Sequence, residues 1–192
     1  MDEPKDNRAR LLTVATRLFA RHGYEAVGVR QLAEAAGVTK PTLYHYFGSK
    51  RGLLEALLAD GFADFFVALD GAALYDYDLL APLTAYADAY FAFAARHRDL
   101  YRLQLALWFA PPQSEAFAAI APYTERQQRF FEAFFARAAR DHGNMIGRQR
   151  PCALTFLGLL NTYAALLLND YVQPDAAMTR HAVHQFMHGI FS

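Results

Sequence analysis

The densest group of side chains that could do chemistry lies between Thr39 and Lys50, in the run TKPTLYHYFGSK. Its hydroxyls, phenols, imidazole and ammonium groups donate hydrogen bonds or carry positive charge, which suits phosphate oxygens and the edges of nucleic-acid bases. Leu43 and Phe47 stand four residues apart, so on a helix both point to one side and the polar residues point outward or flank them. A helix of about two turns is not stable alone. We therefore expect a small helix that neighbours hold in place for outside contact, as in a helix-turn-helix that reads a DNA groove.

The preceding residues predict the neighbours that hold this helix. Apolar residues recur at three- and four-residue steps through 7–22 and again through 29–36, so each range is expected to form an amphipathic helix. Gly23 and Gly37 follow these helices, and glycine accepts the left-handed geometry that ends a helix.

The short helix has its own start and stop signals. Thr39 is a suitable N-cap, and Pro41 is tolerated in the first turn, where its missing N–H has no intrahelical partner to lose. Gly48 closes the segment, and Ser49 is expected to cap the next helix.

The rest of the chain also has helical patterning, with no plausible strand hairpin or repeat. Helices are expected over 49–69, 79–96, 97–109, 114–142, 152–171 and 175–191, with a loop over 71–78 and a polar segment over 143–150. Pro122 predicts a kink or break inside its helix. The expected fold class is all-α, with about nine helices.

Composition sets broad limits on the class of protein. With 192 residues, 54% of them hydrophobic, the chain can hold one large or two small domains with a sizeable core. No run of roughly 18 uninterrupted apolar residues exists, so we expect no membrane span. The charged start, MDEPKDNRAR, does not predict a signal peptide. The single cysteine, Cys152, excludes an internal disulfide framework and suits a reducing cytoplasm.

The formal net charge of zero hides an uneven distribution. Residues 1–51 hold nine Lys and Arg against five Asp and Glu, whereas residues 52–192 hold ten Arg against fourteen acidic residues. A basic quarter joined to an acidic remainder favours a nucleic-acid-binding part and a part with a different task. An excess of four charges can also arise by chance.

The N-terminal quarter resembles the tetracycline-repressor (TetR) family of bacterial transcriptional regulators. The resemblance runs from Arg8 to about Leu58 and includes LLTVATRLFARHGY, VRQLAEAAGV and TKPTLYHYFGSKRGLL, in which cap, proline, buried leucine, paired aromatics and lysine fall at the family spacing. It implies a three-helix helix-turn-helix DNA-binding domain over 1–48 and a helical-bundle ligand-binding and dimerisation domain over 49–192. The later part matches only in its helical character and its length.

The resemblance makes the helix from Thr39 to Phe47 the recognition helix. By position it assigns DNA contact to Arg30, Thr39, Lys40, Pro41, Thr42, Tyr44, His45, Tyr46 and Lys50. We expect bases for Lys40 and Thr42 and phosphates for Tyr44 and Lys50, whereas Arg30 could fork onto guanine or remain a solvated surface arginine. Gly28 departs from the family, which often has a capping Thr or Ser there, so that hydroxyl contact with phosphate is expected to be lost or made by the backbone N–H.

The second part of the chain is rich in aromatic residues, 23 of the 28 lying after residue 51. Large rings can line a pocket for an apolar or aromatic effector, although ordinary core packing explains any single ring better. Polar handles on an otherwise apolar surface select candidate effector-binding residues, namely Tyr90, Tyr101, Trp108, Tyr123, Asn161 and Tyr163. Few charges lie among these helices, which disfavours a strongly ionic effector.

The last two helices are expected to form a homodimer interface, over about 153–170 and 175–191. Residues 153–168 (ALTFLGLLNTYAALLL) are apolar nearly all round, so they need cover on both faces. A partner subunit would supply the second face and, with it, a second recognition helix for a palindromic operator. The alternative is a central buried helix of a monomer.

Two further features have weaker functional interpretations. His181, His184 and His188 fall on one helix face and could hold a metal, but no carboxylate or thiol accompanies them, which favours surface or interface histidines. Cys152 could sense oxidants, but a small buried hydrophobe is the more ordinary role.

These observations predict a ligand-responsive DNA-binding regulator, most simply a repressor that binds a double-stranded operator and is released by a small effector. An activator of the same fold is the alternative, because the sign of regulation depends on the position of the operator. A metal-dependent enzyme that uses the C-terminal histidines is a remote third possibility. The sequence has no nucleophile elbow, phosphate loop or paired-carboxylate metal motif, so we expect no catalytic residues, no metal and no cofactor.

Overall fold

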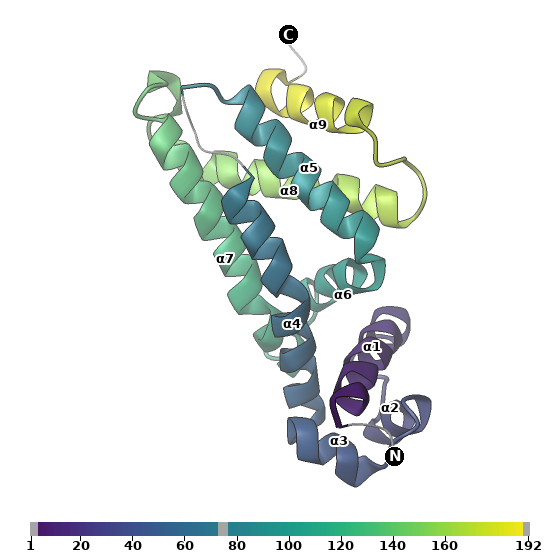
Figure 1. Cartoon of the computed structure of the whole chain (residues 1–192). Helices are drawn as coiled ribbons and strands as arrows, with labels where there is room; N and C mark the ends of the chain where they lie inside the picture. Colours follow the sequence, from purple (N-terminus) through teal and green to yellow (C-terminus); the bar gives the residue numbers. More distant parts are fainter. Residues whose placement is uncertain (1–3, 73–76, 190–192) are drawn as a thin grey trace. The chain divides into compact units, whose positions relative to one another are not determined.

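The structure is a computed structural model that describes residues 4–72 and 77–189 (Figure 1). Within these ranges all regular structure is helical, and the helices are α1 (Pro4–His22), α2 (Val29–Ala35), α3 (Lys40–Phe47), α4 (Lys50–Gly71), α5 (Leu80–Arg96), α6 (Arg98–Trp108), α7 (Glu115–Ala138), the 3-10 turn η1 (Gly143–Met145), α8 (Gln149–Leu168) and α9 (Ala176–His188). The expected all-α class is confirmed. Part of the expected loop over 71–78, residues 73–76, lies outside the described residues.

Helix α7 continues past Pro122, so of the kink or break expected there the break does not occur. A proline at this position leaves the carbonyl group of Ala118 without its helical partner. Both residues are exposed, so solvent can hydrate that carbonyl group and lower the cost. The helix therefore tolerates the proline at its exposed surface.

The chain divides into two compact units. Unit 1 spans residues 1–63 and 99–122, and unit 2 spans residues 64–98 and 123–192. Helices α4 and α7 contribute residues to both. The boundary expected at residue 48 separates a DNA-binding domain from a ligand-binding domain. That functional boundary stays a prediction, because the two compact units are defined by contacts within the fold.

Unit 1 holds the helices of the expected helix-turn-helix. Its core contains side chains with almost no exposure on α1, α2, α3 and the first half of α4: Leu11, Ala15, Phe19, Leu32, Leu43, Leu53, Leu54 and Leu58. The expected inward faces are thus largely confirmed. Leu18, Val29 and Phe47 are only half-buried, and the guanidinium group of Arg8 lies 5.8 Å from the ring centre of Phe47.

Unit 2 is built around α5, which packs against α8 and α9 while those two helices also contact each other. Aromatic rings fill the core beside α7. The ring of Tyr86 meets those of Phe130, Phe131 and Phe134 at 5.2–5.6 Å between centroids and nearly at right angles. Edge-to-face contacts of this kind stabilise aromatic clusters beyond simple burial. Most of the rings here are packing residues.

Polar contacts fix the ends of α8 and α9 in unit 2. The Asp175 carboxylate accepts a hydrogen bond of 2.8 Å from the Met178 N–H and so caps α9. The Thr179 hydroxyl donates to Asp88 of α5 at 2.6 Å. Arg98 donates to the Leu168 carbonyl oxygen at 2.8 Å, where α8 ends. The Thr179 bond therefore ties α9 to α5, and the Arg98 bond ties the end of α8 to the start of α6.

Helix α8 is long and apolar enough to cross a membrane by length and composition, with a mean hydropathy of 1.6. The expectation that the chain has no membrane span stays a prediction. A core helix of a soluble bundle has the same properties, and α8 packs against α5 and α9. Only 33% of the apolar stretch of α8 is buried within the chain, so much of the surface of this helix is left unburied.

Candidate functional site

The turn between α2 and α3 is closed by two backbone hydrogen bonds. The Val38 N–H donates to the Ala33 carbonyl oxygen at 3.0 Å, and the Gly37 N–H donates to that of Glu34 at 3.1 Å. This pairing is the Schellman motif, and it needs a left-handed residue, which Gly37 supplies with φ +64°. The angle between the two helices is therefore set by the backbone.

Helix α3 starts at the predicted cap. The Thr39 hydroxyl accepts a hydrogen bond of 3.3 Å from the Thr42 N–H, and the two threonine hydroxyls lie 2.8 Å apart. Pro41 occupies the first turn, where it loses no helical hydrogen bond. Leu43 is fully buried and anchors the helix to the core of unit 1. Cap and anchor together fix a helix of only eight residues.

The other end of α3 is joined tightly to α4. Gly48 has φ +71°, and its N–H donates to the Tyr44 carbonyl oxygen at 2.8 Å. Ser49 then caps α4 as predicted, because its hydroxyl accepts from the Gly52 N–H at 2.9 Å. A Cβ at Gly52 would overlap the Phe47 carbonyl oxygen, so the first turn of α4 lies directly against the end of α3.

The predicted DNA-facing residues of α3 and its cap are accessible. Thr39, Lys40, Pro41, Tyr44 and His45 are exposed, and Tyr44 keeps 48% of its surface exposed although it is large and aromatic. Thr42 and Tyr46 are half-buried, and the Tyr46 ring lies 5.5 Å from that of His45. The outward face of α3 is thus polar and aromatic, as the sequence predicts, and its contact with DNA stays a prediction.

The predicted contacts outside α3 already have partners within the chain. Arg30 is exposed, but its guanidinium group pairs with Glu34 at 2.7 Å, one helical turn later. The Lys50 ammonium lies 4.1 Å from the centre of the Tyr24 ring. Gly28 is the N-cap of α2 and makes no side-chain cap bond. Arg30 and Lys50 would have to exchange or share these contacts to reach DNA.

Sequence reasoning missed the supporting contacts of Tyr24. The Tyr24 hydroxyl donates to Glu115 at 2.9 Å, and its ring packs on Phe19 at 5.2 Å. Burial raises the pKa of Tyr24, and the adjacent Glu115 carboxylate raises it further. This tyrosine thus joins α1, α7 and the cation of Lys50 within unit 1. Its partner stands 91 residues away, so no local pattern could reveal the bond.

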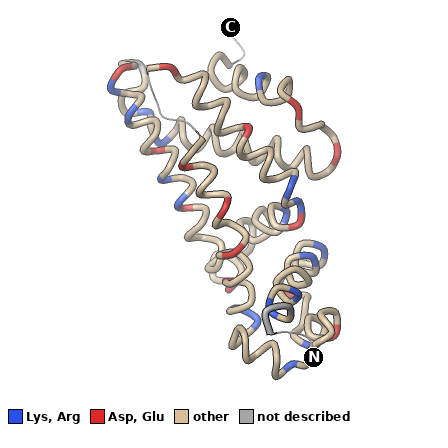
Figure 2. The backbone as a smooth tube through the Cα atoms, in the orientation of Figure 1, with Lys and Arg blue, Asp and Glu red and all other residues tan. Residues whose placement is uncertain are grey.

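The nine Lys and Arg residues of 1–51 lie on helices α1 to α4, which include the expected helix-turn-helix. Lys and Arg residues lie along α1 and at the starts of α3 and α4 (Figure 2). These positions lie on or beside the helices that hold the exposed face of α3. An excess of positive charge there favours association with a polyanion.

The predicted effector-binding residues are mostly packing residues. Tyr90 is fully buried and donates to Gln127 at 3.1 Å, whereas Tyr101 is fully buried and burial raises its pKa. Trp108 stacks on Phe117 at 5.4 Å, the Tyr123 and Tyr163 rings lie 6.4 and 6.0 Å from Phe66 and Phe91, and Asn161 is half-buried. Their contact with an effector stays a prediction.

Gln127 is a residue of interest that the sequence did not single out. It is buried, and its Nε2 atom has no hydrogen-bond partner among the described residues, whereas its oxygen accepts from Tyr90. A buried amide group left unpaired costs about 1–3 kcal/mol. A polar ligand atom that accepted a hydrogen bond from this Nε2 atom would therefore remove an unfavourable contribution to the free energy of the folded protein.

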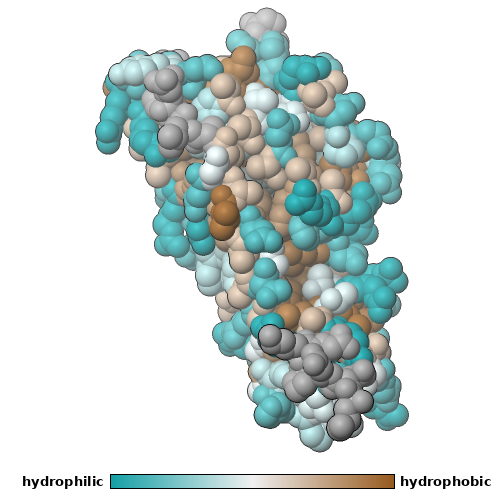
Figure 3. Space-filling model, in the orientation of Figure 1, coloured by the Kyte–Doolittle hydropathy of each residue, from teal (hydrophilic) through white to brown (hydrophobic). Residues whose placement is uncertain are grey.

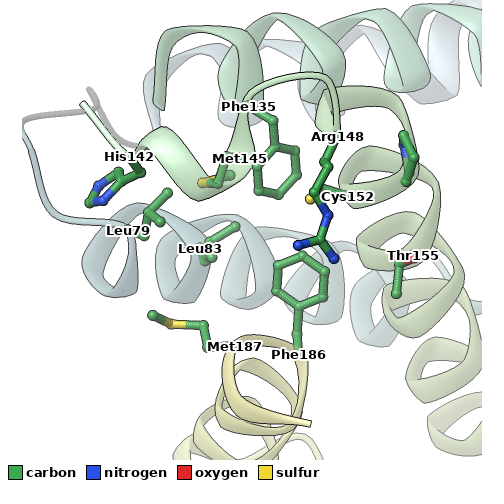
Figure 4. A pocket seen from close by; sticks show the side chains of 11 residues that line it. Leu79, Leu83, Phe135, His142, Met145, Arg148, Cys152, Thr155, Phe186 and Met187 are labelled. Carbon is green, nitrogen blue, oxygen red and sulfur yellow. The ribbon is translucent and has the colours of Figure 1, made fainter. Parts of the chain in front are cut away.

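A cavity of about 430 Å³ lies elsewhere in unit 2, at the start of α8 (Figure 4). None of the six predicted effector-binding residues lines it. Its walls come from α5, α7, η1, α8, α9 and their connections: Leu79, Leu83, Phe135, His142, Met145, Arg148, Pro151, Cys152, Thr155, Phe186 and Met187. Cys152 is half-buried there, so it is not the fully buried residue that the sequence favours.

The C-terminal histidines are surface residues. His181, His184 and His188 are exposed on α9, and the rings of His184 and His188 lie 4.5 Å apart. Among the described residues no group of three or more His, Cys, Asp or Glu side chains could hold a metal ion.

A short helix that is capped, anchored and exposed, in a chain that continues into a helical bundle, is typical of helix-turn-helix transcriptional regulators. Residues 11–57 match the family described as bacterial regulatory proteins, tetR family. The chain is 30% identical over 169 residues to the transcriptional activator FasR of Mycolicibacterium smegmatis, a match that covers 87% of this chain and 75% of that protein. It is 45% identical over 56 residues to the repressor AcnR of Corynebacterium glutamicum, but only 29% of this chain and 30% of AcnR are covered. The chain belongs to the TetR family.

Solved structures show the same fold along the whole chain. The fatty acid degradation regulator FadR of Bacillus halodurans superposes with a TM-score of 0.78 at 19% identity, covering 100% of this chain and 98% of that one. FadR of Bacillus subtilis, solved in complex with stearoyl-CoA, gives 0.75 at 18% identity, with 95% and 98% covered. The protein is a transcriptional regulator with a helix-turn-helix DNA-binding domain and is not an enzyme.

Proposed function

We propose that this regulator is a ligand-responsive repressor that binds a palindromic operator as a homodimer and leaves it when a small, mostly apolar effector binds. The observation that carries the proposal is α3. Leu43 anchors it, Thr39 caps it, and Lys40 and Tyr44 remain exposed on it. A helix so fixed can enter a major groove without losing its own structure.

The contacts with DNA divide into two kinds in this proposal. Lys40 and Thr42, at the start of α3, read base edges, because such helices reach bases with their N-terminal residues. Tyr44, through its hydroxyl, and Lys50, at the start of α4, bind phosphates. The proposed DNA interface also includes Thr39, Pro41, His45, Tyr46 and Arg30. For Arg30 this requires release from Glu34.

Homodimerisation through α8 and α9 is supported by surface that the chain leaves uncovered. Leu154 of α8 and Met187 of α9 are 48% and 38% exposed, although both are large and apolar. Hydrophobic side chains reach the surface at several places on the face drawn in Figure 3. A partner subunit would cover Leu154 and Met187 and supply the second recognition helix that an inverted repeat requires.

Release follows from a change in the separation of the two recognition helices. Helix α4 contributes residues to both compact units, so it is a continuous covalent link from effector domain to DNA-binding domain. An effector that binds one conformation of unit 2 better shifts the dimer toward that conformation. The spacing of the DNA-binding domains then no longer matches the half-sites.

Activation is the second candidate function, because the relative that matches 87% of this chain is named an activator. The same DNA contacts serve either sign of regulation. A promoter–reporter fusion carrying the bound site separates them. Deletion of the regulator raises expression if it represses and lowers it if it activates.

The test of the proposed function is DNA binding by the purified full chain at several salt concentrations. DNA that flanks its own gene is the first target, and footprinting should show two protected half-sites related by a two-fold axis. Binding should weaken steeply as salt rises, because phosphate contacts release counterions. Absence of any specific, salt-sensitive binding would remove the proposal.

A further inference from the structure

The cavity at the start of α8 combines a deep apolar floor with an accessible rim. Leu83 of α5 and Phe135 of α7 are buried at its floor, whereas Arg148, Pro151 and Thr155 are exposed at its edge. Its volume of about 430 Å³ falls within the range of about 300–1,000 Å³ typical of small-molecule sites. The cavity can therefore admit a small ligand from solvent and bury its apolar portion.

Arg148 supplies a permanent positive charge to this cavity. Figure 4 shows its side chain pointing into the cavity, toward Phe186, while Cys152 and Met145 lie along the wall. Among the residues that the structure describes, no aspartate or glutamate lines the cavity. Arg148 forms no ion pair with any residue that the structure describes, whereas Arg150, two residues later, lies 3.7 Å from the Glu132 carboxylate. The charge of Arg148 is thus available to a ligand.

A guanidinium group beside apolar walls selects for a particular chemistry. It binds carboxylate or phosphate oxygens in a fixed fork and gains more from them where water is partly excluded. The apolar walls gain free energy by burying a hydrocarbon chain. A cationic ligand would meet repulsion from Arg148, and a neutral hydrocarbon would leave the arginine without an acceptor.

We propose that this cavity is a binding site for an amphipathic anion, an acyl chain with a negatively charged end that Arg148 binds. The charged end can be a free carboxylate or the phosphates of a carrier to which the acyl group is joined. The site is separate from the Tyr90–Gln127 pair. That its ligand acts as the effector rests on the proposed function, but the binding itself does not.

The single cysteine of the chain offers a direct measurement, because Cys152 lines the cavity. The full-length protein is alkylated with iodoacetamide, and the rate is followed by mass spectrometry with and without decanoate. Decanoyl-coenzyme A distinguishes a carrier-bound acyl group from the free acid. Decan-1-ol and decyltrimethylammonium, which have the same chain with a neutral or cationic end, are the matched controls.

The expected result is that decanoate or decanoyl-coenzyme A slows alkylation of Cys152, whereas the cationic analogue does not. Arg148→Gln should raise the ligand concentration needed for half-protection about tenfold, since it removes a charge-assisted contact. Arg150→Gln, which removes an arginine outside the cavity, should leave it unchanged. The shift in melting temperature caused by each ligand provides the same comparison if Cys152 reacts too slowly to follow.

Equal protection by anionic, neutral and cationic chains would overturn the proposal, as would an Arg148→Gln variant that binds decanoate like the wild type. Absence of both protection and melting shift with either anion would also overturn it. DNA binding of the same samples is measured separately. Ligand binding without any change in DNA affinity would support the site and refute its role as the effector site. DNA release without protection of Cys152 would instead refute the site and leave the proposed function standing.

Discussion

On α3, adjacent residues have different roles: Leu43 stabilises the helix, and its exposed neighbours are available for contact with a partner. Leu43 has no exposed surface, whereas Tyr44, the next residue, keeps 48% of its surface exposed. Burying a leucine side chain contributes about 1.5–3 kcal/mol, which helps to hold a helix too short to be stable alone. The exposed tyrosine contributes little to that stability. Its size and hydroxyl are therefore free for an outside partner.

Tyr44→Phe tests this division at the residue scale. The substitution removes a hydroxyl that we expect to bind phosphate, so the dissociation constant for operator DNA should rise about tenfold. The midpoint of thermal unfolding should not change, since the hydroxyl is exposed. Tyr171→Phe, at a tyrosine that is 78% exposed beyond α8, is the matched control and should bind DNA like the wild type. Identical DNA affinity for the two variants would show that Tyr44 does not contact the operator.

Thr39→Ala tests the cap of α3. The variant loses the acceptor for the Thr42 N–H, so the free energy of unfolding should fall by about 1 kcal/mol. Thr39→Ser keeps the hydroxyl and should retain most of the stability. Urea titration followed by circular dichroism measures both. If the alanine variant were as stable as the serine variant, the 3.3 Å bond would not be what fixes the start of this helix.

Residue types predicted caps and turns well but predicted partners poorly. Thr39, Ser49 and Gly37 each act as expected, because caps and left-handed turns depend on neighbours within a few residues. The contact of Lys50 with Tyr24 was not predicted, since it joins residues 26 positions apart. Local chemistry determines how a helix starts, whereas tertiary packing decides which ring a cation meets.

At the scale of elements, the junction of α3 and α4 is the most tightly constrained feature of unit 1. Gly52 approaches the Phe47 carbonyl oxygen so closely that no Cβ fits without movement. Any displacement of the start of α4 therefore moves the end of α3. In the proposed response to an effector, a shift of α4 would therefore move α3, because α4 contributes residues to both units.

Gly52→Ala should disturb this junction. The added methyl group must push α4 away from Phe47, which should cost about 1–3 kcal/mol of unfolding free energy and weaken DNA binding. Gly71→Ala lies at the other end of the same helix, where a Cβ would meet no described atom within 4 Å, and should leave stability unchanged or slightly higher. Denaturant titrations of the two variants provide the comparison. Equal stabilities would mean that the two helices separate without cost.

Helix boundaries were predicted to within a few residues, but the cavity was not. Periodicity and glycine or proline signals suffice for α1 to α9, because they are local. The cavity needs side chains such as Leu79, Phe135 and Arg148, which come from three distant segments and meet only after folding. Arg148, an arginine before an apolar helix, is too common a pattern in sequences to stand out. Polar aromatic residues such as Tyr101 attracted attention and are fully buried in the core.

At the scale of the whole molecule, the proposed homodimer places the exposed surface of α8 at its interface. Leu154→Glu places a charge where the proposed interface buries a leucine, so the dimer should dissociate at micromolar concentrations. Val67→Glu makes the same change on α4, at a residue that is 73% exposed, and should remain dimeric. Size-exclusion chromatography with light scattering gives the mass of each. A dimeric Leu154→Glu variant would place the interface elsewhere.

The central claim is that the exposed face of α3 reads a specific DNA sequence. The most direct measurement selects binding sites from a random DNA library with the wild-type protein and then titrates the selected site with the wild type, Lys40→Ala and Arg17→Ala. Arg17 is exposed on α1, so its variant controls for the loss of one positive charge. We predict that an inverted repeat is enriched, that Lys40→Ala raises the dissociation constant about tenfold, and that Arg17→Ala changes it far less. Failure to enrich any sequence, or equal affinities for the wild type and Lys40→Ala, would contradict the account.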